Sequence, residues 1–154
     1  MLERKNKQKS SGPTLSRSEI MARVRSKDTT PEIFVRSSLH KAGLRFRIHR
    51  KDLPGNPDII FPSRRIAIFV NGCFWHQHHG CRKAKLPASR REYWETKLGK
   101  NVVRDKLNYV ALESAGWRVI LLWECELTRD FMARLIAELK TGECVSPDSE
   151  QKEE

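Results

Sequence analysis

An apolar run at residues 66–70 leads directly into a segment that is rich in cysteine, histidine and aromatic residues. The run is short, uniformly apolar and preceded by a Pro-Ser-Arg-Arg turn, which predicts a buried β-strand. The following segment, residues 71–81, contains two of the four cysteines, three of the five histidines and two bulky aromatic residues. A rigid strand that ends in such side chains predicts a functional site at its end.

The elements predicted around this strand form a sheet with helices packed against it. Residues 58–61 and 66–70 are strand patterns separated by a short turn, which predicts a hairpin. Residues 44–49 alternate apolar and basic side chains, which indicates a half-buried strand, and the apolar run 117–123 is typical of a central strand. We therefore expect the α/β class, with a mixed β-sheet flanked by helices.

Four helices are expected. One begins near Ser18, and a second runs to residue 42 and stops at Gly43, with Thr30 as its capping residue and Pro31 at its first position. A third begins at Arg90 and continues towards residue 116, with a kink or boundary at Gly99, and a fourth follows Thr128.

The chain is predicted to hold one folded domain between two polar ends. Residues 1–17 form a basic leader, residues 18–140 the domain and residues 141–154 an acidic tail. Lysine and arginine outnumber the acidic residues by 30 to 19, and the net charge of +11 favours a nucleic acid as partner. A secretory signal and a membrane-spanning run are absent from the sequence, so we expect a reducing, cytoplasmic environment.

Cysteines in a reducing compartment are more often metal ligands than disulfides. Cys73, Cys81 and Cys125 supply three soft ligands, and a histidine would complete a tetrahedral zinc site. Spacing alone does not choose the histidine, and reduced buried thiols are the alternative. Cys144 is the weaker candidate because it lies in the predicted tail.

Hydrolysis of a phosphodiester is the chemistry that the remaining polar residues favour. Asp58 follows a turn at the mouth of a strand and offers a hard ligand for Mg²⁺, and a histidine not bound to zinc can act as a general base. Glu32 at a helix start has a sufficient structural role by itself. Phe74, Trp75 and Trp94 are either a small core or wedges that enter stacked bases.

Several motifs resemble those of the very-short-patch-repair (Vsr) mismatch endonucleases. These motifs are Pro-Gly-Asn-Pro-Asp58, Asn71-Gly-Cys-Phe-Trp-His76, Arg91-Glu-Tyr-Trp94, Gly99-Lys-Asn101 with Arg104-Asp105, and Gly116-Trp-Arg-Val119 with Trp123-Glu-Cys125. The resemblance extends over residues 18–127 and implies a restriction-endonuclease-like fold. It also implies an enzyme that initiates very-short-patch repair by nicking 5′ of the thymine in T:G mismatches, which arise by deamination of 5-methylcytosine.

The resemblance further implies roles for individual residues. Asp58 and the backbone carbonyl of Val70 would bind Mg²⁺, His76 would be the general base, and Glu32 and Asn71 would belong to the catalytic site. The implied zinc ligands are Cys73, His78, Cys81 and Cys125. The aromatic residues that would enter DNA are Phe74, Trp75 and Trp94.

Three positions depart from the family pattern. Val70 stands where a threonine is usual, which a backbone contact to the metal would tolerate. Asn71 replaces a histidine thought to assist at the phosphate, which leaves it either a hydrogen-bonding role or none. Gly80 resembles an insertion, so both His78 and His79 remain candidates for the zinc ligand.

The implied partner is double-stranded DNA with a T:G mismatch, together with repair proteins of the MutL and MutS type and a repair polymerase. We expect a monomer that is associated with the nucleoid and not with a membrane. Two other functions fit the same residues. One is a restriction-type endonuclease of the same fold, and the other is a zinc-stabilised DNA-binding module without catalysis.

Overall fold

The computed structural model of the protein describes residues 27–142. The predicted leader 1–17, the helix expected from Ser18 and Cys144 lie outside the described residues. Within residues 27–142, none of the helices is both long enough and apolar enough to cross a membrane.

The sheet is mixed, as predicted, and three-stranded within the described residues. It has the order β1 (Ile59–Phe61), β2 (Ile66–Asn71) and β3 (Arg118–Trp123). β1 pairs with β2 in an antiparallel hairpin, and β3 pairs with β2 in parallel. The hairpin is thus confirmed, whereas the run 117–123 is an edge strand of this sheet and β2 is the central one.

The strand predicted at residues 44–49 is wrong. This segment forms only an isolated bridge between Arg47 and Ile60. Leu44 is buried and Phe46 packs against the core, but Ile48 is exposed and His49 has a φ of 58°. The left-handed backbone at His49 ends the extended conformation, so the apolar alternation does not continue into a ladder.

The α-helices within residues 27–142 are α2 (Thr30–Lys41), α3 (Arg91–Ser114) and α4 (Arg129–Thr141). Thr29, and not Thr30, caps α2 through its side-chain oxygen, which accepts the backbone N–H of Glu32. Thr128 caps α4 as predicted by accepting the N–H of Phe131. α3 continues through Gly99 without a boundary, and its 24 residues span about 36 Å.

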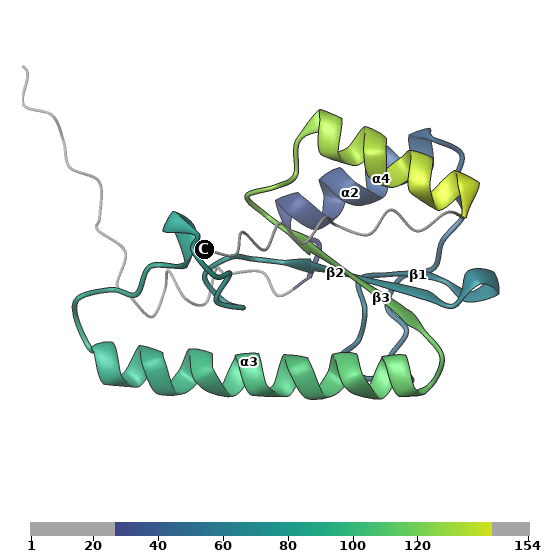
Figure 1. The fold of residues 1–154 in the computed structure, drawn as a ribbon. Helices are drawn as coiled ribbons and strands as arrows, with labels where there is room; N and C mark the ends of the chain where they lie inside the picture. Colours follow the sequence, from purple (N-terminus) through teal and green to yellow (C-terminus); the bar gives the residue numbers. More distant parts are fainter. Residues whose placement is uncertain (1–26, 143–154) are drawn as a thin grey trace, which may run out of the picture.

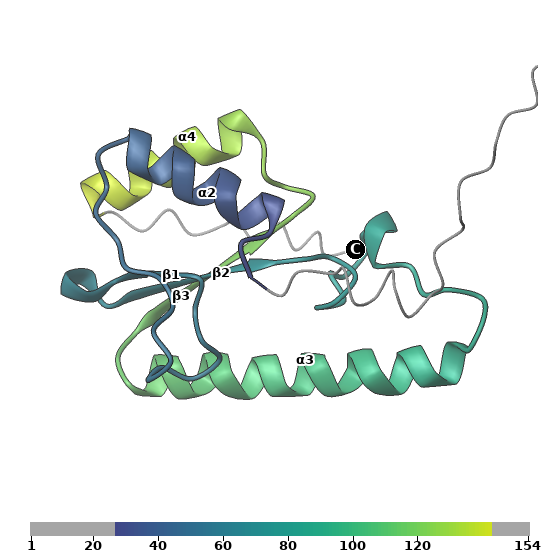
Figure 2. The ribbon, with the colours of Figure 1, turned by 180° about the vertical axis from the view of Figure 1, so that it is seen from behind.

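The sheet lies between two helical layers, with α2 and α4 on one face and α3 on the other (Figure 1; Figure 2). Alternate residues of β2 serve the two layers. Ile66, Ile68 and Val70 join the core beneath α2 and α4. Ala67 and Phe69 pack with Leu112 of α3.

The N-terminal half of α3 extends past the sheet and lies beside the loop that follows β2 (Figures 1 and 2). This loop, residues 72–90, contains the Cys/His segment and one short 3-10 helix, Arg82–Ala84. The end of β2, the loop and α3 therefore converge in one region of the molecule.

Candidate active site and metal cluster

A cleft of about 1340 Å³ opens at this region, between the start of α2, the hairpin and α3. The predicted catalytic and Mg²⁺-binding residues all line it. These residues are Glu32, Asp58, Val70, Asn71 and His76. Lys97, Asn101 and Arg104 of α3 also contribute to its wall.

Asp58 immediately precedes β1 and is anchored to the neighbouring strand at two points. Its backbone N–H donates to the carbonyl of Ile68 at 3.0 Å. Its Oδ2 accepts the backbone N–H of Val70 at 2.8 Å. Among the described residues, no hydrogen bond reaches its Oδ1, so this oxygen remains available to a cation.

The backbone carbonyl of Val70 points towards the side of β2 on which Asp58 lies. Carbonyls of successive strand residues point alternately to the two sides of the strand. The carbonyl of Ile68 accepts from Asp58, whereas that of Asn71 accepts from Glu124 on the β3 side. The Val70 carbonyl shares the orientation of the Ile68 carbonyl. Its oxygen therefore lies on the same side of β2 as the Asp58 carboxylate, at the cleft. Hard oxygen ligands of this kind fit Mg²⁺.

The pKa of the Asp58 carboxyl is raised to about 6. Burial is the largest cause, and the nearby carboxylate of Glu32 raises this pKa further. The N–H of Val70 and the charges of Arg36 and His76 act in the opposite direction. The positive charges near Asp58 therefore do not offset its burial, and a bound cation would favour the ionised carboxylate.

His76 is held by a carboxylate of α3. Its Nδ1 lies 2.6 Å from Oδ2 of Asp105, whose Oδ1 accepts from Arg104 at 2.9 Å. A proton on Nδ1, shared with Asp105, leaves the lone pair of Nε2 as the basic site of the ring. The arrangement is that of a general base oriented by an acid.

The carboxylate of Glu32 is engaged with its own helix start. Its Oε1 accepts from the Thr29 hydroxyl at 2.8 Å, and its Oε2 accepts from the N–H of Asp28 and from Arg36 at 3.0 and 2.6 Å. Glu32 is buried and lines the cleft. Its charge thus reaches Asp58 while its oxygens stabilise the local structure.

Cys73, His78, Cys81 and Cys125 form a cluster whose donor atoms lie within 4.8 Å of one another. The Sγ atoms of Cys73 and Cys125 are 3.7 and 3.2 Å from Nδ1 of His78. In a tetrahedral zinc site, bonds of about 2.0–2.3 Å separate neighbouring ligand atoms by about 3.3–3.8 Å. The cluster could therefore hold a zinc ion. His79 is exposed and lies outside the cluster.

The pKa values of Cys125 and Cys81 are both shifted by their surroundings in the cluster. Loss of hydration, followed by the hydrogen bonds and charges of Cys73 and Cys81, raises the pKa of Cys125 to about 12. The backbone N–H of Lys83 lowers the pKa of Cys81. Three thiolates this close repel one another, so a divalent ion is what would allow them to ionise together.

A left-handed residue separates the two histidines. Gln77 has a φ of 50°, and its side-chain amide donates to the carbonyls of Phe74 and Ala84 at 2.7 and 3.2 Å. The turn at Gln77 therefore places the side chain of His76 at the cleft and that of His78 beside the cysteines. The ring of His78 also stacks on Trp123 at 4.2 Å between centroids.

Phe74, Trp75 and Trp94 pack against one another edge to face, with centroids 5.1 to 6.2 Å apart. Trp94 is only 6% exposed. The ammonium of Lys97 lies 5.7 Å from the centroid of Trp75 and 5.6 Å from that of Trp94. In this structure the three predicted DNA-entering rings thus form a small aromatic cluster at the edge of the cleft.

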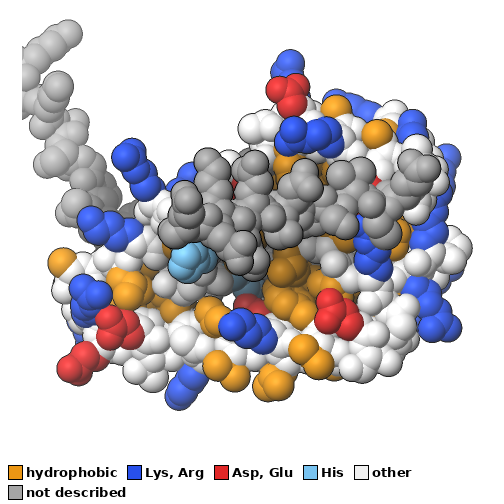
Figure 3. Space-filling view, in the orientation of Figure 1, with side chains coloured by type: hydrophobic (Ala, Val, Ile, Leu, Met, Phe, Trp, Pro, Cys, Tyr) orange, Lys and Arg blue, Asp and Glu red, His pale blue; other side chains and the backbone are white. Residues whose placement is uncertain are grey.

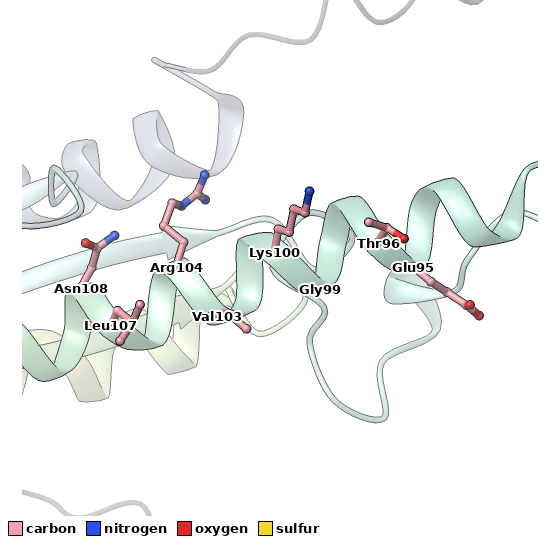
Figure 4. A pocket seen from close by; sticks show the side chains of 8 residues that line it. All are labelled: Glu95, Thr96, Gly99, Lys100, Val103, Arg104, Leu107 and Asn108. Atoms are coloured by element: carbon pink, nitrogen blue, oxygen red, sulfur yellow. The ribbon is translucent and has the colours of Figure 1, made fainter.

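Basic side chains are spread over the surface around this region (Figure 3). Lys100 and Arg104 project to the same side of α3 (Figure 4). Positive charge beside the cleft would attract the phosphates of a nucleic acid.

Sequence reasoning assigned no role to Asp105, Arg36 or Gln77. Asp105 belongs to the Arg104-Asp105 motif of the family resemblance, but the sequence did not link it to His76, and only the distance between them does so. Arg36 follows Glu32 by four residues, a spacing that predicts an ion pair on a helix. For Gln77, the sequence carried no signal of a left-handed conformation.

Comparisons with known proteins find a matching family and several similar sequences. A comparison with protein-family models matches residues 13–83 to the family described as DNA mismatch endonuclease Vsr. The type II nicking enzyme V.XorIIP of Xanthomonas oryzae is 58% identical over 109 residues, which are 71% of this chain and 79% of that relative.

Two further relatives extend the comparison. The DNA mismatch endonuclease Vsr of Escherichia coli is 45% identical over 112 residues, 73% of this chain and 71% of that protein. The type II nicking enzyme V.NmeAIP of Neisseria meningitidis is 39% identical over 132 residues, 82% of this chain and 94% of that protein. These relatives and the family match show that the chain belongs to the Vsr family of DNA mismatch endonucleases.

Proposed function

We propose that this endonuclease nicks double-stranded DNA 5′ of the thymine in a T:G mismatch, with Mg²⁺ as its catalytic cofactor. The observation that carries the proposal is that the Asp58 carboxylate, the Val70 carbonyl and the His76–Asp105 pair meet at one cleft. The name of the Escherichia coli relative, a mismatch endonuclease, supports a mismatch as the substrate. Such a mismatch arises when 5-methylcytosine deaminates opposite guanine.

His76 is the proposed general base. Asp105 holds the Nδ1 proton, and the lone pair on Nε2 removes a proton from the attacking water as the new phosphorus–oxygen bond forms. The bond from phosphorus to the leaving oxygen breaks, and that oxygen takes a proton from solvent water. The carboxylate of Asp105 stabilises the imidazolium that results. Lys97 and Arg104 add positive charge at the cleft wall, where the phosphate would lie.

Mg²⁺ would be held by Asp58 and the carbonyl of Val70, where it would polarise the phosphodiester and stabilise charge on the leaving oxygen. Because the second ligand is a backbone atom, valine serves as well as threonine at position 70. In the same way, we propose that Cys73, His78, Cys81 and Cys125 hold a structural zinc ion that fixes the loop carrying His76.

A nicking assay on end-labelled duplexes tests the proposed function. T:G and C:G duplexes in varied flanking sequences are incubated with the protein and Mg²⁺, and each strand is followed separately. We expect a single nick in the thymine strand, 5′ of the mismatched base. Double-strand cleavage of the fully paired duplex at a fixed sequence would instead identify a restriction-type enzyme.

Replacing Asp105 with asparagine should slow nicking by about 100-fold or more. Asparagine can donate a hydrogen bond to Nδ1 of His76 and thereby favour the tautomer whose Nε2 carries the proton. The rate under single-turnover conditions and the melting temperature measure the effect. Asp130→Asn, in the first turn of α4, is the matched control and should nick at the wild-type rate. If Asp105→Asn nicks at the wild-type rate, His76 is not the general base.

Replacing Trp75 with alanine should weaken binding to a T:G duplex by about 10-fold more than binding to a C:G duplex. Stacking on an unpaired or weakened base contributes about 1–3 kcal/mol, and a mismatched step opens more easily than a paired one. Fluorescence anisotropy with both duplexes measures the difference. Equal losses on the two duplexes would mean that Trp75 serves mainly to pack against Phe74 and Trp94.

A further inference from the structure

Asn71 is the last residue of β2, and strand alternation turns its side chain towards α3. Ala67 and Phe69, four and two residues earlier, pack against Leu112 of α3. Asn71 is only 2% exposed and lines the cleft with Asp58 and His76. A buried amide in this position needs hydrogen-bond partners.

α3 supplies that partner through Tyr109. The Nδ2 of Asn71 donates to the hydroxyl oxygen of Tyr109 at 3.1 Å. The ring of Tyr109 is fixed independently, because it packs edge to face on Phe69 at 4.9 Å between centroids. The hydroxyl therefore presents a fixed acceptor to the end of β2.

Tyr109 lies one helical turn after Asp105, so α3 supports the cleft at two successive levels. Asp105 orients His76, and Tyr109 contacts Asn71. Residues four apart share one face of a helix, and this face of α3 contacts the end of β2 and the loop after it. In both contacts, a residue of α3 holds a residue that lines the cleft.

The chemistry of an amide makes its orientation decisive. Asn71 does not titrate, so at a phosphate it can contribute only through hydrogen bonds. One of its N–H groups is given to Tyr109, and the other remains for a ligand in the cleft. A donor aimed at a charged oxygen stabilises it only if the donor is held in place beforehand.

We propose that Tyr109 is a positioning residue, which holds the amide of Asn71 so that its second N–H donates to a phosphate oxygen of the DNA. This inference rests on the proposed phosphodiester chemistry of the cleft. Burial raises the pKa of the Tyr109 hydroxyl, and the carboxylates of Asp105 and Asp58 raise it further. The phenol therefore remains neutral at physiological pH and keeps its own proton while it accepts from Asn71.

Tyr109→Phe tests the proposal because it removes the hydroxyl and keeps the ring on Phe69. We expect kcat for nicking to fall by about 5- to 20-fold with KM unchanged. The melting temperature should fall only slightly, because Asn71 lines the cleft and water can reach the N–H that is released. Tyr93→Phe is the matched control, since it removes the only other tyrosine hydroxyl in the chain. Tyr93 is exposed and does not line the cleft, so this variant should retain the wild-type kcat.

A double-mutant cycle with Asn71→Ala separates positioning from other roles. If Tyr109 acts through Asn71, the double variant should be no slower than Asn71→Ala alone. The side-chain amide signals of Asn71 in a nitrogen-15 NMR spectrum should also shift in Tyr109→Phe and not in Tyr93→Phe. Additive losses in the cycle, or a wild-type kcat in Tyr109→Phe, would overturn the proposal.

The cycle is run on whichever duplex the wild-type protein nicks fastest. A preference for a duplex other than T:G would therefore refute the proposed substrate while the role of Tyr109 is still measured.

Discussion

Asp58→Asn should abolish nicking and, in the same protein, raise the melting temperature at pH 7.5. The loss of activity follows from the loss of the carboxylate charge that would hold Mg²⁺, and we expect a decrease of at least about 1000-fold. Asparagine keeps an oxygen that can accept the N–H of Val70, so the local hydrogen bond survives. The two effects together distinguish a catalytic carboxylate from a structural one.

The gain in stability follows from the raised pKa. The Asp58 carboxyl has a pKa of about 6 in the folded protein and about 3.9 when unfolded. The folded state therefore binds the proton more tightly, and the benefit is complete below pH 4 and lost as the pH rises through 6. Above pH 6 the wild-type protein carries the full cost of a buried charge, which asparagine removes. We expect a gain of about 1–2 kcal/mol, or about 3 to 8 °C.

Thermal denaturation from pH 4 to pH 8, in buffer without Mg²⁺, measures this difference. The advantage of Asp58→Asn should be absent at pH 4, grow up to pH 6 and remain constant above it. Asp52→Asn is the matched control, because Asp52 is exposed and its hydrogen bond to Arg50 lowers its pKa to about 2. This control should nick normally and should not be stabilised at pH 7.5. A destabilised Asp58→Asn would mean that the carboxylate mainly supports the hairpin.

The strands and helices could be predicted where a local signal coincided with tertiary packing. The β1–β2 hairpin and the capped helix α4 follow from apolar runs, a turn and the Thr128 hydroxyl. The segment 44–49 carried an equally good alternation, but the left-handed backbone at His49 ended it. The position of β3 at the edge of the sheet could not be predicted either, because strand order depends on contacts between distant segments.

The candidate site could be predicted as a set of residue types, and its internal connections could not. Asp58, His76 and the cysteines were identified because their chemistry is unusual in a short span. The partners Asp105 and Tyr109 lie on α3 among many polar neighbours, 29 and 38 residues after the residues that they contact. Their roles depend on how α3 crosses the end of β2, which is a property of the packed fold.

Removal of the proposed zinc is expected to lower the melting temperature by about 10 °C or more. The four ligand residues join the loop 72–90, which follows β2, to Cys125 in the turn that follows β3. Binding of zinc to such a cluster is coupled to folding, since the unfolded chain does not preassemble the ligands. Cys125→Ala should therefore destabilise the protein and release the bound metal.

Cys144→Ala is the matched control, because Cys144 is the one cysteine predicted to lie outside the ligand set. It should keep one zinc ion per chain and the wild-type melting temperature. Zinc content by a colorimetric chelator and thermal denaturation with and without EDTA measure both variants. An unchanged melting temperature in Cys125→Ala, with zinc absent from the wild-type protein, would refute the site.

The destabilisation should also be local. Within the described residues, the larger core of α2, the sheet and α4 contains no member of the loop 72–90. We therefore expect Cys125→Ala to keep its helical circular dichroism at 20 °C, while amide hydrogen exchange accelerates in the loop. Nicking should be lost with the loop, because His76 and Trp75 are both carried on it. An equal acceleration of exchange in the loop and in α2 and α4 would instead mean that the metal stabilises all parts of the structure alike.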